Sequence, residues 1–122
     1  MKNLMPQITR KRLIIEGFYR IEITHEFIKK FLKELSDFLG MMIILEPVIF
    51  SPNVKTNSIH SGLAGFMAWV ESGVSFYTWS NYKFFTLDIY TCKDFEIKKA
   101  IRFVKEALDS PKLVYEEFHY EG

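Results

Sequence analysis

A serine that follows a glutamate in a short turn is the feature of this sequence best suited to chemistry. Residues 68–79 read AWVESGVSFYTW, so two apolar, β-rich runs flank Glu71-Ser72-Gly73. Hairpin turns are commonly made with Asn-Gly or Asp-Gly, so Glu-Ser before this glycine needs another reason. A serine hydroxyl in a strained turn can attack the preceding peptide carbonyl and convert the amide into an ester. Elimination at the serine then cuts the chain and leaves an N-terminal pyruvoyl group, a built-in carbonyl that withdraws electrons from a bound amine. The attack needs a stabilised oxyanion and a base that takes the hydroxyl proton.

The other reactive side chains are few. His25, His60 and His119 stand far apart without metal-ligand spacing, so we expect no metal site. The glycines fit neither nucleotide-binding fingerprint. Cys92 is the only cysteine, which excludes an intrachain disulfide and fits a reducing compartment.

The composition is that of an ordinary globular domain. The 122 residues suffice for a single domain, residues 1–122, and the net charge of +1 gives no field that would attract nucleic acid. The apolar stretches are too short to span a bilayer and the N-terminus lacks a signal layout, so we expect a cytoplasmic protein without a membrane partner. The short basic run Arg10-Lys11-Arg12 is expected to be a solvated N-terminal arm.

Hydrophobic periodicity predicts the element order β-α-β-β-β-β-α-β. The first helix is expected over residues 27–39, with Thr24 as its cap and Gly40 as its stop; the second is expected to be capped by Asp94 and ended by Pro111. Strands are expected over residues 13–21, 41–50, 63–70, 73–79, 84–92 and 113–120, with a polar loop over residues 51–62. Pro47 marks an edge strand or a bulge.

This order predicts an α+β fold, a two-layer sandwich in which two helices cover one face of a mostly antiparallel sheet. The other face must also be covered, and we expect a second subunit to do this. Alternation along the two central strands places polar and aromatic residues on that other face. They are Ser75, Tyr77, Trp79, Asp88, Tyr90 and Cys92.

The stretch ESGVSFYTW, followed by LDIYTC in the next strand, resembles the core of the bacterial and archaeal S-adenosylmethionine decarboxylases. LIIEGFY is similar to the first strand of that family, and the helices fall where the family has helices. The resemblance implies that the Glu71-Ser72 bond cleaves itself and that Ser72 becomes a pyruvoyl cofactor. This group would condense with the amine of S-adenosylmethionine, or of a related small ligand, in a homodimer. The product of the decarboxylation would supply aminopropyl groups for spermidine synthesis.

The resemblance also assigns roles to single residues. Cys92 matches the cysteine that donates a proton after decarboxylation, and Trp79 matches an aromatic residue that stacks on adenine. The aromatic face of Trp79 could also attract the sulfonium cation of the substrate. Asn81 occupies the position of an acidic residue that holds the ribose hydroxyls, so we expect it to contact the substrate.

Several positions depart from the family's pattern. The family has a histidine five residues after the reactive serine and a serine eight residues before it, both of which assist self-cleavage; here these positions are Tyr77 and Ala64. A phenol carries protons less readily than an imidazole at neutral pH. The histidine that usually follows Glu-Ser is Gly73, and the register of a second adenine-stacking residue, a phenylalanine, falls near Ser58.

Three functions therefore stay open within this resemblance, and an α+β dimer with an unrelated role is a further alternative. The chain is a decarboxylase of S-adenosylmethionine in which Tyr77 replaces the family's histidine, or in which another residue such as His60 reaches in. Alternatively, it decarboxylates another amino acid such as arginine or ornithine, which the loss of the ribose-binding acid at Asn81 would fit. In the third alternative Ser72 is never converted, and the chain binds a ligand or acts as a regulatory subunit.

Overall fold

The computed structural model describes residues 1–121. The strands are β1 (Lys11–Phe18), β2 (Ile43–Phe50), β3 (Ala64–Trp69), β4 (Ser72–Trp79), β5 (Phe84–Thr91) and β6 (Leu113–Glu117), and the helices are α1 (His25–Phe38) and α2 (Ile97–Ala107). The predicted order of elements is confirmed, and the architecture is the expected α+β sandwich.

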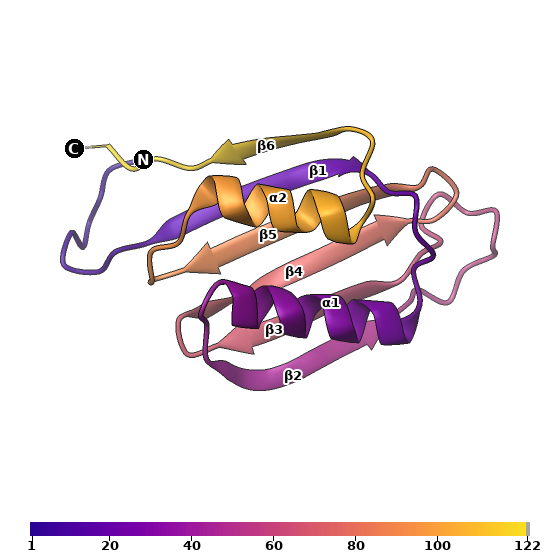
Figure 1. Ribbon diagram of the computed structural model, residues 1–122, viewed down its shortest axis with the longest axis horizontal. Helices are drawn as coiled ribbons and strands as arrows, with labels where there is room; N and C mark the ends of the chain where they lie inside the picture. The colour runs from indigo at the N-terminus through magenta and orange to yellow at the C-terminus, as the bar shows by residue number, and fades with distance from the viewer. Residues whose placement is uncertain (122) are drawn as a thin grey trace.

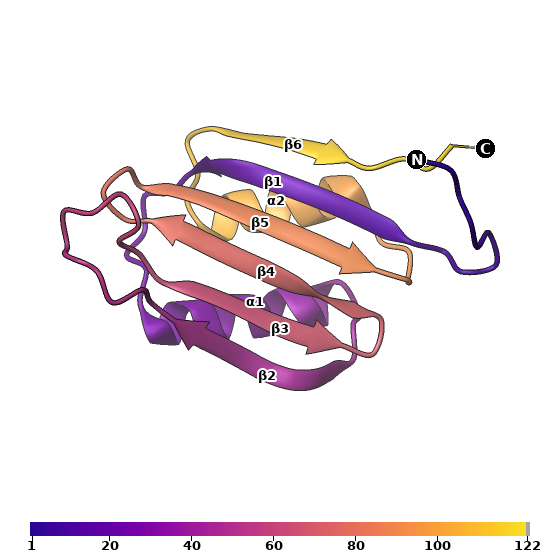
Figure 2. The same cartoon turned by 180° about the vertical axis from the view of Figure 1, so that it is seen from behind.

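The six strands form one sheet in the order β2-β3-β4-β5-β1-β6, in which every neighbouring pair is antiparallel. Both helices lie on the same face of this sheet, in front of it in Figure 1 and behind it in Figure 2. We call the opposite face, which faces the viewer in Figure 2, the open face. The sheet leaves β2 and β6 as its two edges.

The first helix forms where a cap and an apolar stripe coincide. The Thr24 hydroxyl accepts a hydrogen bond from the Phe27 amide at 3.0 Å, which confirms its predicted role as cap. One side of α1 is buried against the sheet, and its one buried polar side chain, Ser36, accepts a hydrogen bond from the Trp69 indole at 2.7 Å. The buried hydroxyl thus costs little, because it also donates to the Leu32 carbonyl.

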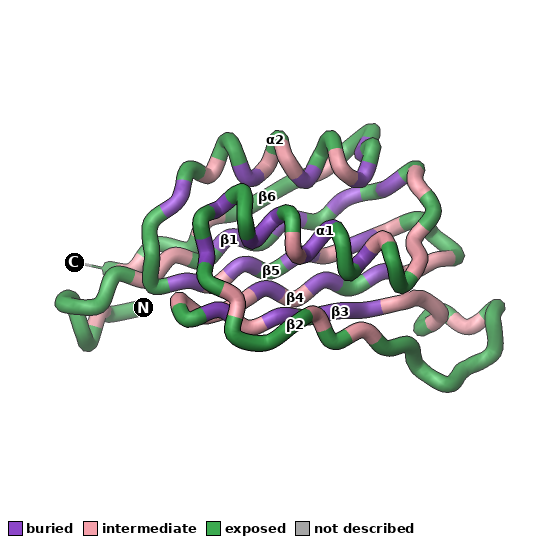
Figure 3. The backbone as a smooth tube through the Cα atoms, turned by 60° about the horizontal axis from the view of Figure 1, so that its bottom comes forward, coloured by how far each residue is buried: buried purple, intermediate pink, exposed green. Residues whose placement is uncertain are grey.

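The hydrophobic core fills the space between the helices and the sheet. Figure 3 shows the buried segments of the strands and helices facing each other across this space. Fully buried side chains come from both layers, and burial of each contributes about 1.5–3 kcal/mol. They include Leu13, Ile15, Ile28, Leu32, Leu35, Phe76, Phe85 and Leu87.

The open face has the composition that alternation predicted. In β4, Val74, Phe76 and Thr78 are buried, whereas Tyr77 is exposed and Ser75 and Trp79 are half-buried. The face also carries large apolar side chains that remain 38–45% exposed. These are Ile14, Phe18, Leu45, Val48, Phe50 and Phe66. Two of these residues lie in β1 and four lie in β2 and β3, so they flank the two central strands of the face. Exposed apolar side chains of this size are suited to contact with another surface.

Some local expectations were wrong. Lys11 and Arg12 belong to β1 and are no solvated arm: the Lys11 ammonium donates to Asp94 at 2.7 Å, and the Arg12 guanidinium lies 3.9 Å from the centre of the Tyr90 ring. Asp94 is therefore not the cap of α2. The cap position is Glu96, which makes no side-chain capping bond.

The strand ends also differ from the predicted ranges by a few residues. β1 ends at Phe18 because the Tyr19 and Arg20 amides turn away to the Lys83 and Leu108 carbonyls. β6 ends at Glu117 rather than at residue 120. Pro47 lies in an edge strand at a register shift, as expected.

Candidate functional site

The turn between β3 and β4 holds Ser72 in a strained backbone conformation. Trp69 and Ser72 are paired, so Val70 and Glu71 alone make the turn. The φ angle of Ser72 is 136°, a region that residues with a Cβ rarely adopt. Such strain costs about 1–3 kcal/mol and is kept only where the surrounding structure imposes it.

Hydrogen bonds fix the peptide that joins Glu71 to Ser72. The Cys92 amide donates to the Glu71 carbonyl at 2.7 Å, and the Val70 amide donates to the Met42 carbonyl at 2.8 Å. In return, the Met42 amide donates to the Glu71 carboxylate at 3.0 Å. The strand β5 and the segment before β2 therefore hold the turn from both sides. The Cys92 amide also polarises the carbonyl that a Ser72 attack would convert into an oxyanion.

Gly73 is required by close packing inside the hairpin. A Cβ on this residue would lie 2.6 Å from the Met67 carbonyl oxygen. The glycine therefore lets β4 pair tightly with β3 immediately after the strained serine.

Three of the predicted site residues come together at this turn. Glu71 lies in the turn after β3, Ser72 begins β4, and Cys92 directly follows β5. The pairing of Ser72 with Thr91 brings Cys92 beside the other two residues. Thr91 is buried, and its hydroxyl accepts a hydrogen bond from the Lys93 amide at 3.0 Å. The chain thus bends after Thr91 and leaves Cys92 exposed.

The other three predicted residues lie toward the opposite end of β4. Tyr77 and Trp79 are five and seven residues beyond Ser72, about 16 and 23 Å along an extended strand, and Asn81 follows in the turn to β5. Within one chain the structure therefore separates Tyr77, Trp79 and Asn81 from the Glu71-Ser72 bond.

A cavity of about 480 Å³ lies at this second end, beneath the loop of residues 51–62. Its walls include Phe50, His60, Ala64, Tyr77 and Trp79, and we call it the loop cavity. Trp79 also borders a neighbouring cavity of about 500 Å³, formed with Phe18, Ile59, Tyr82 and Phe84. These volumes are in the range of small-molecule sites, and the walls are mostly apolar.

Asn81 holds the loop in place. Its side-chain amide donates to the carbonyls of Thr56 and Ser58 at 3.0 and 2.9 Å. Both amide hydrogens are therefore used within the chain, and only the side-chain oxygen is left to accept a bond from a ligand.

The middle of the open face carries charged side chains between the two ends. Burial raises the pKa of Asp88, which lies in β5 opposite Ser75. The Arg12–Tyr90 stack lies in the same row of the sheet as Gly73. The strand that leads to Cys92 thus carries one charged group, Asp88, and the charged Arg12 of the neighbouring β1 stacks on its Tyr90.

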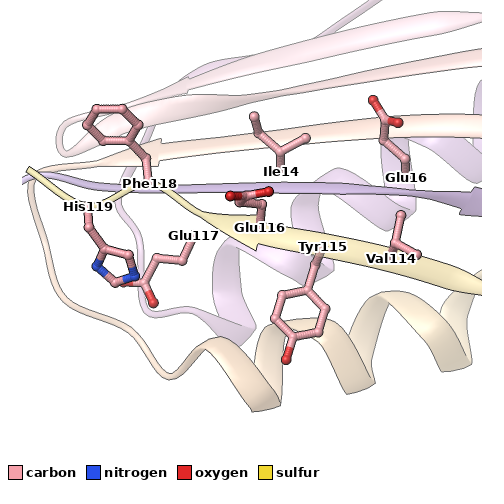
Figure 4. Close-up of a pocket in the computed structure, with 8 residues that line it drawn as sticks. All are labelled: Ile14, Glu16, Val114, Tyr115, Glu116, Glu117, Phe118 and His119. Carbon is pink, nitrogen blue, oxygen red and sulfur yellow. The ribbon is translucent and has the colours of Figure 1, made fainter. Parts of the chain in front are cut away.

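A further cavity of about 710 Å³ wraps around the free edge of β6 and contains none of the predicted site residues. Figure 4 shows Ile14 and Glu16 of β1 on one side of the strand plane and Tyr115 and His119 on the other. This edge cavity places His119 far from the loop cavity, beyond β5 and β1.

Sequence reasoning missed the backbone groups of the site. The positions of the Cys92 amide and of both Met42 backbone groups depend on strand register. Because every residue except proline has a backbone amide, residue types do not show which amide donates at a site. The one available signal was that the predicted start of β4 and end of β5 should lie side by side. The same signal places the Cys92 side chain near Ser72.

Comparisons with known proteins identify the family and the fold of this chain. The S-adenosylmethionine decarboxylase family profile matches residues 19–120. An S-adenosylmethionine decarboxylase proenzyme of Pyrobaculum arsenaticum is 34% identical over 88 residues, which cover 66% of this chain and 70% of that protein. The crystal structure of the adenosylmethionine decarboxylase from Aquifex aeolicus has the same fold, with a TM-score of 0.73 at 16% identity over 93% of this chain and 91% of that one. This chain belongs to the S-adenosylmethionine decarboxylase family.

Proposed function

We propose that the chain cleaves itself between Glu71 and Ser72 and then decarboxylates S-adenosylmethionine, with the pyruvoyl group made from Ser72 as its cofactor. The observation that carries the proposal is the turn itself. A serine at φ 136° follows a carbonyl that accepts a 2.7 Å hydrogen bond from the Cys92 amide.

The chemistry of cleavage fits this turn. As the Ser72 hydroxyl attacks the Glu71 carbonyl carbon, negative charge develops on the oxygen that the Cys92 amide already contacts, so the donor is in place before the reaction. Breaking the peptide bond also releases the strain at Ser72. The hydroxyl proton must leave and the nitrogen of Ser72 must gain one as the ester forms. β-Elimination then releases the Glu71 carboxylate and leaves a dehydroalanine, whose imine tautomer reacts with water to give the pyruvoyl group and ammonia.

The residues around Ser72 also fit the pyruvoyl group. This group supplies an electrophilic carbonyl that binds a substrate amine and accepts electrons as carbon dioxide leaves. Cys92 is exposed beside the turn, where its thiol can return a proton to the substrate carbon. In the uncut chain the Cys92 amide donates to the Glu71 carbonyl.

The cavities around Trp79 support a nucleoside substrate. The indole is accessible from two mostly apolar cavities, and an aromatic face can stack on a purine or attract a sulfonium cation. The remaining free oxygen of Asn81 can accept a hydrogen bond from a ribose hydroxyl, which is the contact that we predict for this residue.

A homodimer is part of the proposal, because Tyr77 and Trp79 are too far from Ser72 of their own chain. If two open faces pack about 10 Å apart, a two-fold axis that runs across the strands near Val74 and Ser75 sets position 77 of one copy opposite position 72 of the other. Such a dimer also covers the exposed apolar side chains of the open face.

Two observations favour other candidates. The Asn81 amide nitrogen is already bonded within the chain, so Asn81 has a single side-chain oxygen with which to contact the two ribose hydroxyls. This favours a smaller amino-acid substrate such as arginine or ornithine. Ala64 and Tyr77, which face each other across β3 and β4, favour an uncut chain that binds a ligand or regulates a partner, because neither side chain is an imidazole or an aliphatic hydroxyl.

The test is the mass of the purified, denatured protein. Chains of residues 1–71 and 72–122, the second blocked by a pyruvoyl group, support self-cleavage. Decarboxylation assays with S-adenosylmethionine, arginine and ornithine then identify the substrate. An intact chain after long incubation refutes self-cleavage and favours the regulatory candidate, and light scattering tests the dimer in either case.

A further inference from the structure

We propose that His60 carries the proton during self-cleavage, and that it acts on the Glu71-Ser72 bond of a second copy of the chain. This role rests on the proposed self-cleavage.

No histidine lies beside the turn of a single chain among the residues that the structure describes. The Glu71 carboxylate already accepts the Met42 amide, the Lys93 ammonium donates to the Gly40 carbonyl, and the Thr91 hydroxyl and the Cys92 thiol are the other groups close to the turn. An imidazole is the side chain best suited both to take and to return a proton near neutral pH. Of the three histidines, His25 begins α1 behind the sheet and His119 lies at the edge cavity, which leaves His60.

His60 is held at the Tyr77 end of the open face. It lines the loop cavity together with Ala64, Tyr77 and Trp79, and it is exposed to solvent. The imidazole therefore comes from the loop of residues 51–62 to the place where Tyr77 offers a phenol.

The chain around His60 is tied down, although it is a loop. The His60 amide donates to the Ser58 hydroxyl at 3.1 Å, and Ser80 donates to the Ser61 carbonyl from its amide at 2.9 Å and its hydroxyl at 3.0 Å. Gly62 packs so closely on β4 that a Cβ there would lie 2.1 Å from the Thr78 carbonyl oxygen. These contacts fix the backbone on both sides of His60.

His60 can reach a Ser72 only across a dimer. Tyr77, which lines the same cavity, is about 16 Å along β4 from Ser72 of its own chain. With the two-fold axis near the middle of β4, the loop cavity of one copy faces the turn of the other, and each dimer contains two such pairs.

The proposed step moves one proton. The neutral His60 imidazole of one copy takes the hydroxyl proton of Ser72 in the other as the oxygen bonds to the Glu71 carbonyl carbon. It then gives that proton to the Ser72 nitrogen as the carbon–nitrogen bond breaks. The products are an ester, a free amine and the neutral imidazole.

Cleavage in variants tests this role, with intact mass followed over time. We expect His60→Ala to slow cleavage at least about 100-fold, the lower range for the loss of a general acid–base group, and added imidazole to restore part of the rate. His119→Ala is the matched control: it removes an exposed histidine of the edge cavity and should leave the rate unchanged. Circular dichroism checks that both variants fold.

Co-expression of two differently tagged chains tests the action across the dimer. One chain carries Ser72→Ala and keeps His60; the other carries His60→Ala and keeps Ser72. We expect the His60→Ala chain to be cut in the mixture and to stay intact alone.

The outcomes separate this role from the proposed function. If wild-type protein is cut and His60→Ala is cut at the same rate, His60 has no such role, whereas self-cleavage stands. Failure of imidazole or of the Ser72→Ala partner to restore cleavage also overturns the role. Wild-type protein that stays intact refutes self-cleavage and the role together.

Discussion

At the scale of single residues, the case for the Glu71-Ser72 peptide as the cleavage site that we propose depends more on backbone geometry than on side-chain type. Ser72 is strained, and the carbonyl before it is held by an amide that comes from the end of another strand. Among the positions that depart from the pattern expected from the sequence resemblance, 64 and 77 are the two that we propose to act in proton transfer. A change of side chain there would alter the rate of proton transfer while the geometry of the turn stays the same.

Restoring these two side chains should therefore increase self-cleavage. Ala64→Ser and Tyr77→His place a hydroxyl and an imidazole opposite each other across β3 and β4. We expect the double variant to be cleaved at least about tenfold faster than wild type, by intact mass over time. Ala64→Ser with Tyr77→Phe is the control that lacks the imidazole. An unchanged rate in the double variant would show that these positions do not limit cleavage.

The charges of two aspartates give opposite effects on stability. Because burial raises the pKa of Asp88, the folded chain binds this proton more tightly than the unfolded chain. Stability is then lost as the pH rises from the usual range of an aspartate through this raised pKa, so Asp88→Asn should be more stable than wild type at pH 7. This difference should disappear below the usual range of an aspartate. Thermal unfolding over a pH series measures it.

Asp94 provides the control with the reverse sign. The hydrogen bond and charge of Lys11 lower the pKa of Asp94, so its contribution is present above the usual range of an aspartate and lost as the pH falls through the lowered pKa. Asp94→Asn should therefore be less stable than wild type at pH 7. Equal signs for the two variants would contradict this interpretation.

At the scale of elements, the loop of residues 51–62 determines the shape of the cavities at Trp79. Its attachment depends on Asn81, whose amide contacts two loop carbonyls, and on the bonds between Ser80 and Ser61. A residue predicted to bind substrate is thus also a support for the wall of the site.

Loss of the Asn81 amide should loosen this loop. Each of its two hydrogen bonds is worth about 0.5–1.5 kcal/mol, so Asn81→Ala should increase trypsin cleavage at Lys55, within the loop, by roughly fivefold or more. The global melting temperature should change little. Asn53→Ala, a substitution at an exposed position in the same loop, is the control, and equal cleavage of the two variants would argue against the role of Asn81.

The success of sequence reasoning differed between these elements for physical reasons. The Thr24 cap, the Pro47 irregularity and the two faces of β4 follow from local rules and were predicted. Asp94 was wrongly taken as a cap because its partner, Lys11, is distant in the sequence. The division of the candidate site between the two ends of β4 follows from the spacing of its residues along that strand, whereas the position of Cys92 beside Glu71 depends on the tertiary pairing of β4 with β5.

At the scale of the whole molecule, the strand order interleaves the two halves of the chain. Residues before Ser72 supply β1, β2 and β3, and the remainder supply β4, β5 and β6. Of the five neighbouring pairs, β3–β4, β5–β1 and β1–β6 join one half to the other. No helix among residues 1–121 is long and apolar enough to cross a membrane.

Because β1 lies between β5 and β6, cleavage after Glu71 should change the kinetic order of refolding. An intact chain forms its six-stranded sheet in a unimolecular process, at a rate independent of protein concentration, before two copies associate. Once residues 1–71 and 72–122 are separate polypeptides, neither can complete the sheet alone, and refolding from denaturant should become second order in subunit concentration at low protein concentration. Stopped-flow measurements over a dilution series distinguish the two cases. A cleaved protein of this topology is stable while it stays folded, yet each unfolding event lets the halves diffuse apart, so its lifetime in dilute solution depends on how slowly it unfolds.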